Sequence, residues 1–555
     1  MNRSISLTLL AALLLPGLLS AQDAVPEEAR KAAEVINEAS LRGPVGFLAD
    51  DLLEGRGPAS RGDRLTQLYL ASTLQYLGFA PAFGADGYLQ TFAVVGVEAT
   101  PPKTWSFQKD GQSVTLAARD QFMAASGVQE DRSVLKDAEL VFVGYGIEAP
   151  EYGWNDFKGM DLKGKVLVML NNDPDWDPAL FEGVRRQYYG RWSYKYESAA
   201  RQGAAGAILI HTTPSAGYPW QVVQTSWTGP QFELPAAGEP RIQVASWVTE
   251  DAARQIAKLA GRDLDALVQS ARSRDFRPIP LGVTTSLALS NRVDKTQTAN
   301  VGGLLRGSDP KLAEEVVIYT AHHDHLGIGT PDATGDTIYN GALDNGAGVT
   351  QVLAIARAYA ALPAAPRRSV LILFVAAEEQ GLLGSEYYAK HPSLPPGRIA
   401  ANINYDGGNI FGRSLEVASI GLGKSSLDGI VKTLAAEQGR TVVGDQFPDR
   451  GSFYRSDQFN FAKIGVPAIY MGAGVKFRDH ADDWGKERVE AYVQKNYHQP
   501  SDEITAEWTF DGMIEDARLG FFAGLLVANA DQMPTWTPGD EFEAARKAAL
   551  AAVGK

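Results

Sequence analysis

Three of the chain's seven histidines lie within four residues of one another, at the end of an apolar run. They are His322, His323 and His325, and Asp324 lies among them. Because His322 and Asp324 are two positions apart, both side chains point to the same side if the segment is extended. The imidazole could then bind a metal while the carboxylate orients it. An ordinary polar loop is the alternative interpretation.

Acidic residues follow other apolar segments in the same way. Asp344 lies in a glycine-rich turn before a helical pattern, where it could bind a metal or cap the helix. Glu378 and Glu379 directly follow a buried-type strand, and two adjacent carboxylates repel one another unless something positive lies nearby. One glutamate could bind a metal while its neighbour accepts a proton from water. A solvated face is the alternative, although the apolar approach disfavours it.

Two further positions complete the set. Asp406 ends the short apolar run 401–405, and His498 lies far downstream between Tyr497 and Asp502. Each of these residues alone could be structural. Together, the clusters supply two histidines and three carboxylates, with one glutamate to spare, which suits two divalent ions that share one carboxylate.

Composition narrows the choice of metal and of partner. The chain has 555 residues, a formal net charge of −14 and no cysteine. Nucleic-acid binding depends on surplus Lys and Arg, so an acidic chain disfavours it. Without cysteine there is no disulfide, thiol nucleophile or thiolate ligand. A metal must therefore be held by nitrogen and oxygen, which favours zinc and allows manganese or cobalt in its place.

The elements that must position these residues are strands alternating with helices. Strand patterns occur at 316–320, 369–377, 401–405 and 467–471, and helical patterns occur at 347–362, 427–438 and 513–529. This alternation predicts an α/β fold with a mostly parallel sheet flanked by helices. In such a sheet, ligands bind beyond the carboxyl ends of the strands, which is where the acids and histidines are expected.

The rest of the chain is organised around this block. Residues 1–21 have the layout of a secretory signal peptide, and no later apolar run is long enough to span a membrane. We therefore expect an exported protein, periplasmic or extracellular, with no membrane contact in its mature form. Residues 26–41 and 249–273 have helical patterns, whereas 212–245 looks rich in loops. No feature of the sequence indicates an oligomeric state.

Several motifs resemble the di-zinc aminopeptidases of peptidase clan MH, family M28, and the resemblance covers most of the mature chain. The motifs are AHHDHLG (321–327), GALDNGAGV (341–349), FVAAEEQGLLGS (374–385), NYDGG (404–408), YRSDQFNFAKIGVPAIY (454–470) and YHQPSD (497–502). The resemblance implies the zinc-exopeptidase (phosphorylase/hydrolase-like) fold and two Zn²⁺ per chain. It also implies the metal ligands, which are His322, Asp344, Glu379, Asp406 and His498.

The resemblance further implies a role for each site residue. His322 and Asp406 would bind one zinc, Glu379 and His498 the other, and Asp344 would bridge them. Three residues would be catalytic: Glu378 as general base, Asp324 as a supporting acid beside His322, and Tyr497 as a stabiliser of the oxyanion. His323 and His325 would belong to the wall of the site. The longer spacing between His322 and Asp344 indicates an insertion at the rim of the site.

The middle of the chain resembles a protease-associated (PA) domain inserted into the catalytic domain. DLKGKVLVML (161–170) and KYESAARQGAAGAILIH (195–211) carry this resemblance, and His211 is expected to be structural. The expected organisation is a signal peptide at 1–21, a catalytic domain split between 24–105 and 286–535, an insert at 106–285 with its core at about 136–270, and a helical tail at 536–555.

The expected activity is hydrolysis of N-terminal peptide bonds of peptides or proteins. Acidic residues such as Asp449 or Asp457 could accept the substrate's amino group. The same site could instead serve a carboxypeptidase or dipeptidase, for which Arg450 and Arg455 could bind a carboxylate. A glutaminyl-cyclase-like transferase would use one zinc, and a receptor-like binding protein would be expected to have lost ligands.

Overall fold

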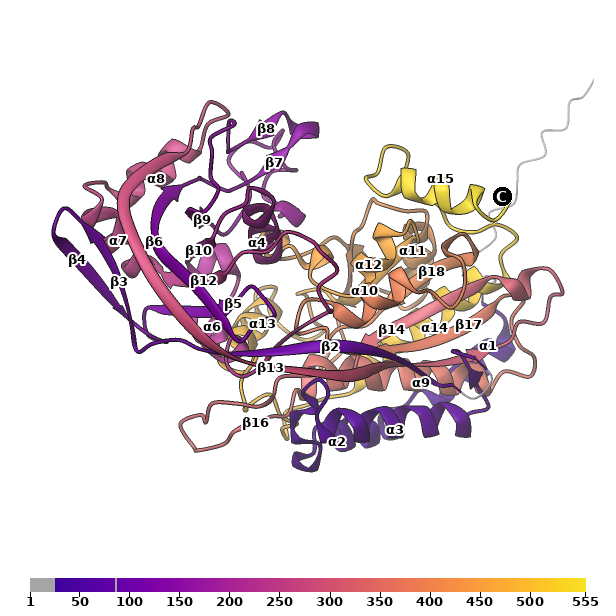
Figure 1. The fold of residues 1–555 in the computed structure, drawn as a ribbon. Helices are drawn as coiled ribbons and strands as arrows, with labels where there is room; N and C mark the ends of the chain where they lie inside the picture. The colour runs from indigo at the N-terminus through magenta and orange to yellow at the C-terminus, as the bar shows by residue number, and fades with distance from the viewer. Residues whose placement is uncertain (1–24, 85–86) are drawn as a thin grey trace, which may run out of the picture.

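The computed structural model describes residues 25–84 and 87–555, so the predicted signal peptide lies outside the described residues. Figure 1 shows two lobes joined by the long strand β13 (Ile279–Leu305) and by β2 (Leu89–Thr100), which pairs with it. The first half of β13 pairs with strands of one lobe, and the second half pairs with strands of the other. We call these the second lobe (residues 104–290) and the first lobe (the remaining described residues).

The sheet of the first lobe is centred on three parallel strands. β14 (Val316–His322) lies between β17 (Ser369–Val375) and β18 (Ile399–Asn404), and it runs parallel to both. The remaining strands extend the sheet on both sides; they are β21 (Ala468–Ala473), β19 (Glu416–Ile420) and β20 (Thr441–Val443) beyond β18, and β13, β2 (Leu89–Thr100) and β1 (Ala80–Pro81) beyond β17. The predicted α/β fold is confirmed.

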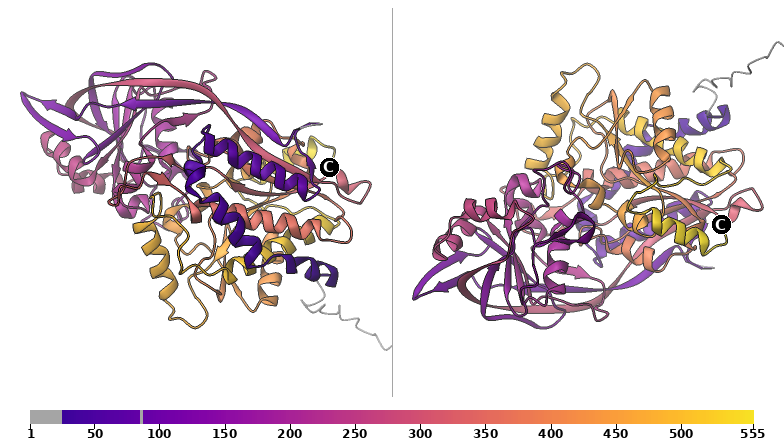
Figure 2. Two further views of the ribbon diagram at one scale, coloured as in Figure 1. Left: turned by 90° about the horizontal axis from the view of Figure 1, so that it is seen from below. Right: turned by 90° about the horizontal axis from the view of Figure 1, so that it is seen from above.

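Helices cover both faces of this sheet because alternate side chains of its strands point to opposite sides. In β14, Val317 and Tyr319 pack into one apolar core, whereas Val316 and Ile318 pack into another. The helices on the first face are α1 (Glu27–Ala32), α2 (Glu38–Leu48), α3 (Arg61–Tyr76), α9 (Gly348–Ala360), α11 (Leu427–Glu437) and α14 (Asp511–Asn529). Those on the other face are α10 (Leu383–Lys390) and α12 (Gln458–Lys463), and the layers are visible in Figure 2.

The second lobe has a sheet and cores of its own. Its strands β9, β10 and β12 are parallel, and β6 continues this sheet toward β13. Their bounds, with those of the neighbouring strands, are β3 (Thr104–Lys109), β4 (Gln112–Ala117), β5 (Phe122–Ser126), β6 (Arg132–Phe142), β9 (Val166–Leu170), β10 (Gly206–His211) and β12 (Val244–Thr249). Two apolar clusters flank it. The predicted domain boundaries remain a prediction.

Two predicted helices are divided in the structure, each by a residue that starts a new helix. The pattern at 26–41 forms α1 and α2, because Asn37 accepts a hydrogen bond from the Ser40 N–H and caps α2. The pattern at 249–273 forms α7 (Glu250–Leu259) and α8 (Leu264–Ala271), because Asp263 caps α8.

The segment predicted to be loops, residues 212–245, contains short elements. These are α5 (Thr213–Ala216), α6 (Trp220–Ser226) and β11 (Gln231–Glu233). The other α-helices and strands of the described residues are α4 (Trp192–Arg201), α13 (Trp484–Lys495), α15 (Glu543–Ala551) in the tail, and the two-stranded pairs β7 (Glu148–Ala149) with β8 (Trp154–Asn155) and β15 (Gly327–Ile328) with β16 (Ile338–Tyr339). Within residues 25–84 and 87–555, no helix combines the length and apolar character needed to cross a bilayer.

Candidate metal centre and cavity

The five predicted metal ligands gather at one edge of the central sheet. His322 is the last residue of β14, and Glu379 and Asp406 follow shortly after β17 and β18. Because these strands are parallel neighbours, their carboxyl ends meet at the same edge. Asp344 reaches this edge from the loop before α9, and His498 reaches it from the loop after α13.

Asp344 lies between the two histidines. Its Oδ1 is 3.2 Å from His322 Nε2, and its Oδ2 is 3.3 Å from His498 Nε2. Asp406 Oδ1 is 3.4 Å from His322 Nε2, and Glu379 Oε2 is 3.0 Å from His498 Nε2. The five side chains therefore form two groups that share one carboxylate.

The turn that carries Asp344 is held by hydrogen bonds. Both oxygens of the buried Asp502 carboxylate accept backbone N–H groups, from Leu343 at 3.1 Å and from Asp344 at 3.0 Å. Helix α9 starts only at Gly348, whose N–H donates to the side-chain oxygen of Asn345. Asp344 thus does not cap the helix, and its carboxylate is free to face the histidines.

Asp324 holds the loop that carries the glutamate pair. Its carboxylate accepts the backbone N–H of Glu378 at 3.0 Å and that of Glu379 at 3.3 Å. It is fully buried, and its Oδ1 lies 3.8 Å from His322 Nδ1, beyond hydrogen-bond distance. Asp324 therefore supports the glutamates more directly than it supports His322, beside which it was predicted to act.

Of the two histidines expected in the wall of the site, the structure places only His325 there. Its Nδ1 lies 2.7 Å from Glu379 Oε1, and with Asp344 and Glu379 it offers ligand atoms within 4.8 Å of one another. His323 points away from the site, and its Nε2 lies 3.0 Å from Asp63 Oδ1. His325 is thus a second histidine beside Glu379, on the opposite oxygen from His498.

The charged groups of the cluster shift one another's pKa values. Burial lowers the pKa of His498, but the nearby Glu379 and Asp344 carboxylates outweigh burial and raise this pKa to about 10. For Asp344, burial raises the pKa, but the adjacent His322 and His498 imidazoles bring it well below its usual range. The carboxylates thus favour positive charge at both histidines.

The pKa of the remaining glutamate, Glu378, shifts in the opposite direction from that of Asp344. Burial raises the pKa of Glu378 well above its usual range; the charge of His322 opposes this shift, and those of Asp406 and Glu379 add to it. Its Oε2 lies 3.9 Å from His322 Nε2. Glu378 is therefore a carboxylate beside the cluster that has an increased tendency to accept a proton.

The donor set fits divalent metal ions. His498 Nε2 is buried, and among the described residues no hydrogen-bond partner satisfies it, although two carboxylate oxygens lie within 3.3 Å. A nitrogen so placed, with the shared Asp344 carboxylate beside it, suits a metal ligand. The nitrogen and oxygen donors suit zinc.

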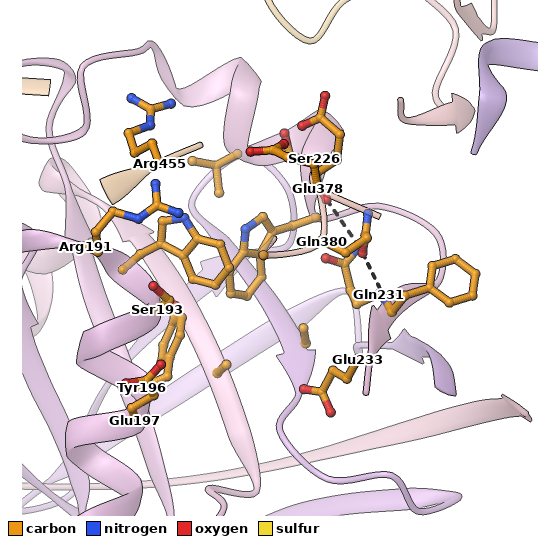
Figure 3. A pocket seen from close by; sticks show the side chains of 18 of the residues that line it. Arg191, Ser193, Tyr196, Glu197, Ser226, Gln231, Glu233, Glu378, Gln380 and Arg455 are labelled. Atoms are coloured by element: carbon orange, nitrogen blue, oxygen red, sulfur yellow. Dashed lines mark hydrogen bonds between the residues drawn. The ribbon is translucent and has the colours of Figure 1, made fainter. Parts of the chain in front are cut away.

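A cavity of about 500 Å³ opens onto this cluster and is lined by both lobes. The first lobe contributes Glu378 and Gln380, and the second contributes Tyr196 and Glu197 from α4 (Figure 3). Aromatic rings form an apolar part of the wall, where Trp227 lies 5.8 Å from Tyr196 between ring centroids. The cavity could therefore hold the apolar side chain of a ligand beside the cluster.

Tyr497 lines the cavity next to the cluster. Its ring stacks on His498 at 3.9 Å, and its hydroxyl oxygen accepts a hydrogen bond from Arg455 Nη2 at 3.1 Å. Because this arginine donates, the phenolic hydrogen remains available for an acceptor in the cavity. The role of Tyr497 in stabilising an oxyanion stays a prediction.

Several other residues shape the site, although nothing in the sequence points to them. Arg56, which is buried, donates to the backbone oxygens of His323 and Gly341, each at 2.9 Å, and so ties together the two loops that carry His322 and Asp344. Arg191 and Ser226 reach the cavity from the second lobe. Their contacts join segments far apart in the chain, and no local pattern predicts them.

Comparison with known proteins shows which family and which fold the chain resembles. Residues 300–521 match Peptidase family M28, which confirms the resemblance seen in the sequence. All five candidate ligands and the three predicted catalytic residues lie within this range.

Two curated relatives are named as aminopeptidases. The chain is 27% identical over 265 residues to "probable leucine aminopeptidase 2" of Aspergillus oryzae, which covers 44% of this chain and 48% of the relative. It is 28% identical over 446 residues to "Aminopeptidase NAALADL1" of Mus musculus, which covers 70% of this chain and 55% of the relative. The chain thus spans about half the length of these curated relatives.

The fold is similar to that of the solved "Aminopeptidase from Aneurinibacillus sp. strain AM-1". The TM-score is 0.52 at 16% identity, over 89% of this chain and 95% of that chain. At this identity the likeness concerns the fold, and it agrees with the α/β architecture.

Proposed function

Because residues 300–521 match Peptidase family M28, we propose that this chain is a zinc-dependent exopeptidase. In its leading form, the proposal is an aminopeptidase that hydrolyses the N-terminal bond of peptides or proteins with two zinc ions and a glutamate base. The observation that carries it is the Asp344 carboxylate, with one oxygen toward His322 and the other toward His498. A shared carboxylate of this kind is suited to hold two metal ions ~3.5–4 Å apart, as in two-metal hydrolases.

The residues would divide the metals between them. His322 and Asp406 would hold one zinc, Glu379 and His498 the other, and Asp344 both, with manganese or cobalt able to bind the same donors. When bound, the ions would polarise the peptide carbonyl and lower the pKa of the attacking water toward about 7. His325 would orient Glu379 through the hydrogen bond to its other oxygen.

The protein's own groups would move the protons. Glu378 would accept a proton from the attacking water and deliver it to the nitrogen of the leaving amine. Tyr497 would donate its phenolic hydrogen to the developing oxyanion. Asp324 would keep Glu378 in place through the backbone hydrogen bond.

The cavity offers contacts for the end of a peptide. Its aromatic wall suits an apolar side chain, and the carboxylates of the cluster that line the cavity could accept hydrogen bonds from a terminal ammonium. Of the acceptors considered from the sequence, Asp457 is fully buried and accepts a hydrogen bond from Ser385 Oγ at 2.5 Å. Its carboxylate is therefore not accessible to a substrate's amino group.

One observation favours a second candidate function, a carboxypeptidase or dipeptidase. Arg191 and Arg455 lie on the same side of the cavity (Figure 3), and burial together with the charge of Arg455 lowers the pKa of Arg191 to about 10. Two guanidinium groups so placed suit a carboxylate. Arg450, which the sequence also suggested, packs on the Phe447 ring at 4.0 Å.

A substrate panel separates the two candidates. The proposal expects the zinc-loaded protein to cleave peptides with a free amino terminus, to fail on N-acetylated versions, and to tolerate C-terminal amidation. The reverse pattern would favour the carboxypeptidase, and a requirement for both free termini would favour the dipeptidase. Hydrolysis of none of these peptides would contradict both. The number of zinc ions bound per chain separates both candidates from a glutaminyl-cyclase-like transferase, which would use one zinc.

The remaining sequence predictions belong to this proposal. Residues 106–285 would be an insert that contains a PA domain with its core at about 136–270, and residues 1–21 would be a signal peptide that directs the chain to the periplasm or the exterior. N-terminal sequencing of protein recovered from the cell exterior or periplasm would test the latter, because removal of the signal peptide creates a new terminus near residue 22.

A further inference from the structure

The second lobe touches one of the two histidines of the metal centre. Ser226 is the last residue of α6, and its Oγ lies 2.8 Å from His498 Nδ1. Figure 3 shows Ser226 on the side of the cavity where Glu378 and Gln380 lie. A residue of the second lobe therefore contacts a candidate ligand held by the first.

The contact with Ser226 bears on which ring nitrogen of His498 carries the hydrogen when a metal is bound. Nε2 faces Asp344 and Glu379, so Nε2 is the nitrogen available for a metal. When Nε2 is a ligand, Nδ1 must carry the hydrogen of the neutral ring, and Nδ1–H then donates to Ser226 Oγ. Outer hydrogen bonds of this kind fix the orientation and tautomer of a metal-binding histidine.

The two histidines of the centre are oriented differently. His322 Nδ1 lies 3.3 Å from the backbone oxygen of Asp324, two residues along its own segment. His498 comes from a loop, and its outer partner comes from the other lobe. His322 is therefore oriented within the first lobe, whereas His498 depends on how the second lobe is placed.

The segment around Ser226 is fastened to the first lobe at both ends. Gln221 Nε2, on α6, donates to the backbone oxygen of Gln494 on α13 at 3.0 Å. The backbone N–H of Phe232, on β11, donates to Gln380 Oε1 at 2.9 Å, beside Glu379. β11 also pairs with β2. These contacts hold Ser226 against His498.

We propose that Ser226 is a positioning residue which holds His498 for metal binding, so that the second lobe controls occupancy of the metal position formed by His498 and Glu379. The inference rests on the proposed two-zinc function and deepens it. It assigns to the second lobe a direct part in assembling the centre, and it predicts that the two metal positions respond differently to changes in that lobe.

The test uses the full chain and measures zinc binding by competition with a chromophoric chelator. Ser226→Ala should weaken one of the two zinc equivalents ~10- to 100-fold and leave the other unchanged. Ser226→Thr, which keeps a hydroxyl, should restore the lost affinity. Thr225→Ala is the matched control, because the Thr225 hydroxyl bonds the backbone oxygen of Gln221 within α6.

The outcomes separate this inference from the proposed function. If the unaltered chain does not bind two zinc ions, the proposed function fails. If it binds two and Ser226→Ala binds both as tightly, the inference alone is overturned. It is also overturned if Ser226→Ala weakens both equivalents together with the melting temperature, because Ser226 would then merely stabilise the fold.

Discussion

The backbone N–H of Glu378 donates to the carboxylate of Asp324 at 3.0 Å, in a place from which water is excluded. The acid comes from the segment after β14 and the amide from the segment after β17. This bond therefore fixes the strand end that carries the proposed base relative to the strand end that carries His322. The adjacent N–H of Glu379 donates to the other oxygen.

Asp324→Asn should destabilise both the fold and the centre. One asparagine oxygen can still accept a hydrogen bond, but its NH₂ group would face a second N–H, leaving a buried donor unpaired at a cost of about 1–3 kcal/mol. We expect a lower free energy of unfolding in urea. We also expect zinc affinity to fall by ~10-fold or more.

Asp309→Asn is the control for this change. Asp309 also accepts two backbone N–H groups, from Lys311 and Leu312, but it lies in a solvent-accessible turn. That variant should keep wild-type zinc binding. If Asp324→Asn also kept both stability and zinc affinity, the supporting role of Asp324 would be wrong.

Glu378→Gln should keep zinc and lose turnover. The amide is nearly the same size as the carboxylate but cannot accept the proton of the attacking water, so kcat should fall by ~10²- to 10⁴-fold. Zinc content and kcat are measured on the same preparation. The control is Glu386→Gln, which removes an acid of α10 that pairs with Lys390. A kcat near the wild-type value in Glu378→Gln would rule out this glutamate as the base.

Tyr497→Phe should affect the transition state more than substrate binding. The change removes the phenolic hydrogen while keeping the ring that stacks on His498. We expect kcat to fall by ~10²-fold, with a much smaller change in KM. Steady-state kinetics on one peptide give both values. A large rise in KM at unchanged kcat would instead assign Tyr497 to ground-state binding.

His211 should make stability depend on pH. It is buried among Tyr218, Trp220 and Trp247, and burial lowers its pKa from 6.5 to about 4. Because the folded-state pKa lies below the unfolded value, the unfolded state binds protons first as the pH falls from about 6.5 to about 4. Stability is therefore lost in that window, by about 2 kcal/mol between pH 7 and pH 5.

His211→Gln isolates this contribution. The glutamine amide can still donate to the backbone oxygen of Tyr218, which lies 3.1 Å from His211 Nε2, but it does not titrate. Urea unfolding at pH 7 and pH 5 should show a smaller loss of stability than in the wild type. His480→Gln, at an exposed ring stacked on Trp484, is the control. An unchanged loss in His211→Gln would contradict the assignment.

The sequence predicted the parts of the molecule that depend on local pattern. Apolar runs ending in His322, Glu378 and Asp406 predicted buried strands, and parallel pairing brought their ends together as the pattern required. Asp344 remained ambiguous, because a glycine-rich turn before a helix suits a cap equally well. Hydrogen bonds from its turn to Asp502, far along the chain, help to hold its carboxylate toward the histidines.

Other parts could not be predicted because they depend on distant contacts. Asn37 divides a helix that has continuous periodicity, and α6 lies in a segment whose Gly, Pro and Ser content indicated loops. Nothing in the sequence points to the contacts of Arg56 and Ser226. They act through hydrogen bonds across 267 and 272 positions, to His323 and His498, and only the folded chain brings them together.

Anomalous diffraction at the zinc edge, from crystals of the zinc-loaded chain, would locate the proposed metal ions. We expect two peaks. One should lie between His322, Asp344 and Asp406, and the other between Asp344, Glu379 and His498. A single peak would contradict the two-zinc centre, and a second peak at His325 Nδ1 with His498 unbound would contradict the assignment of the ligands.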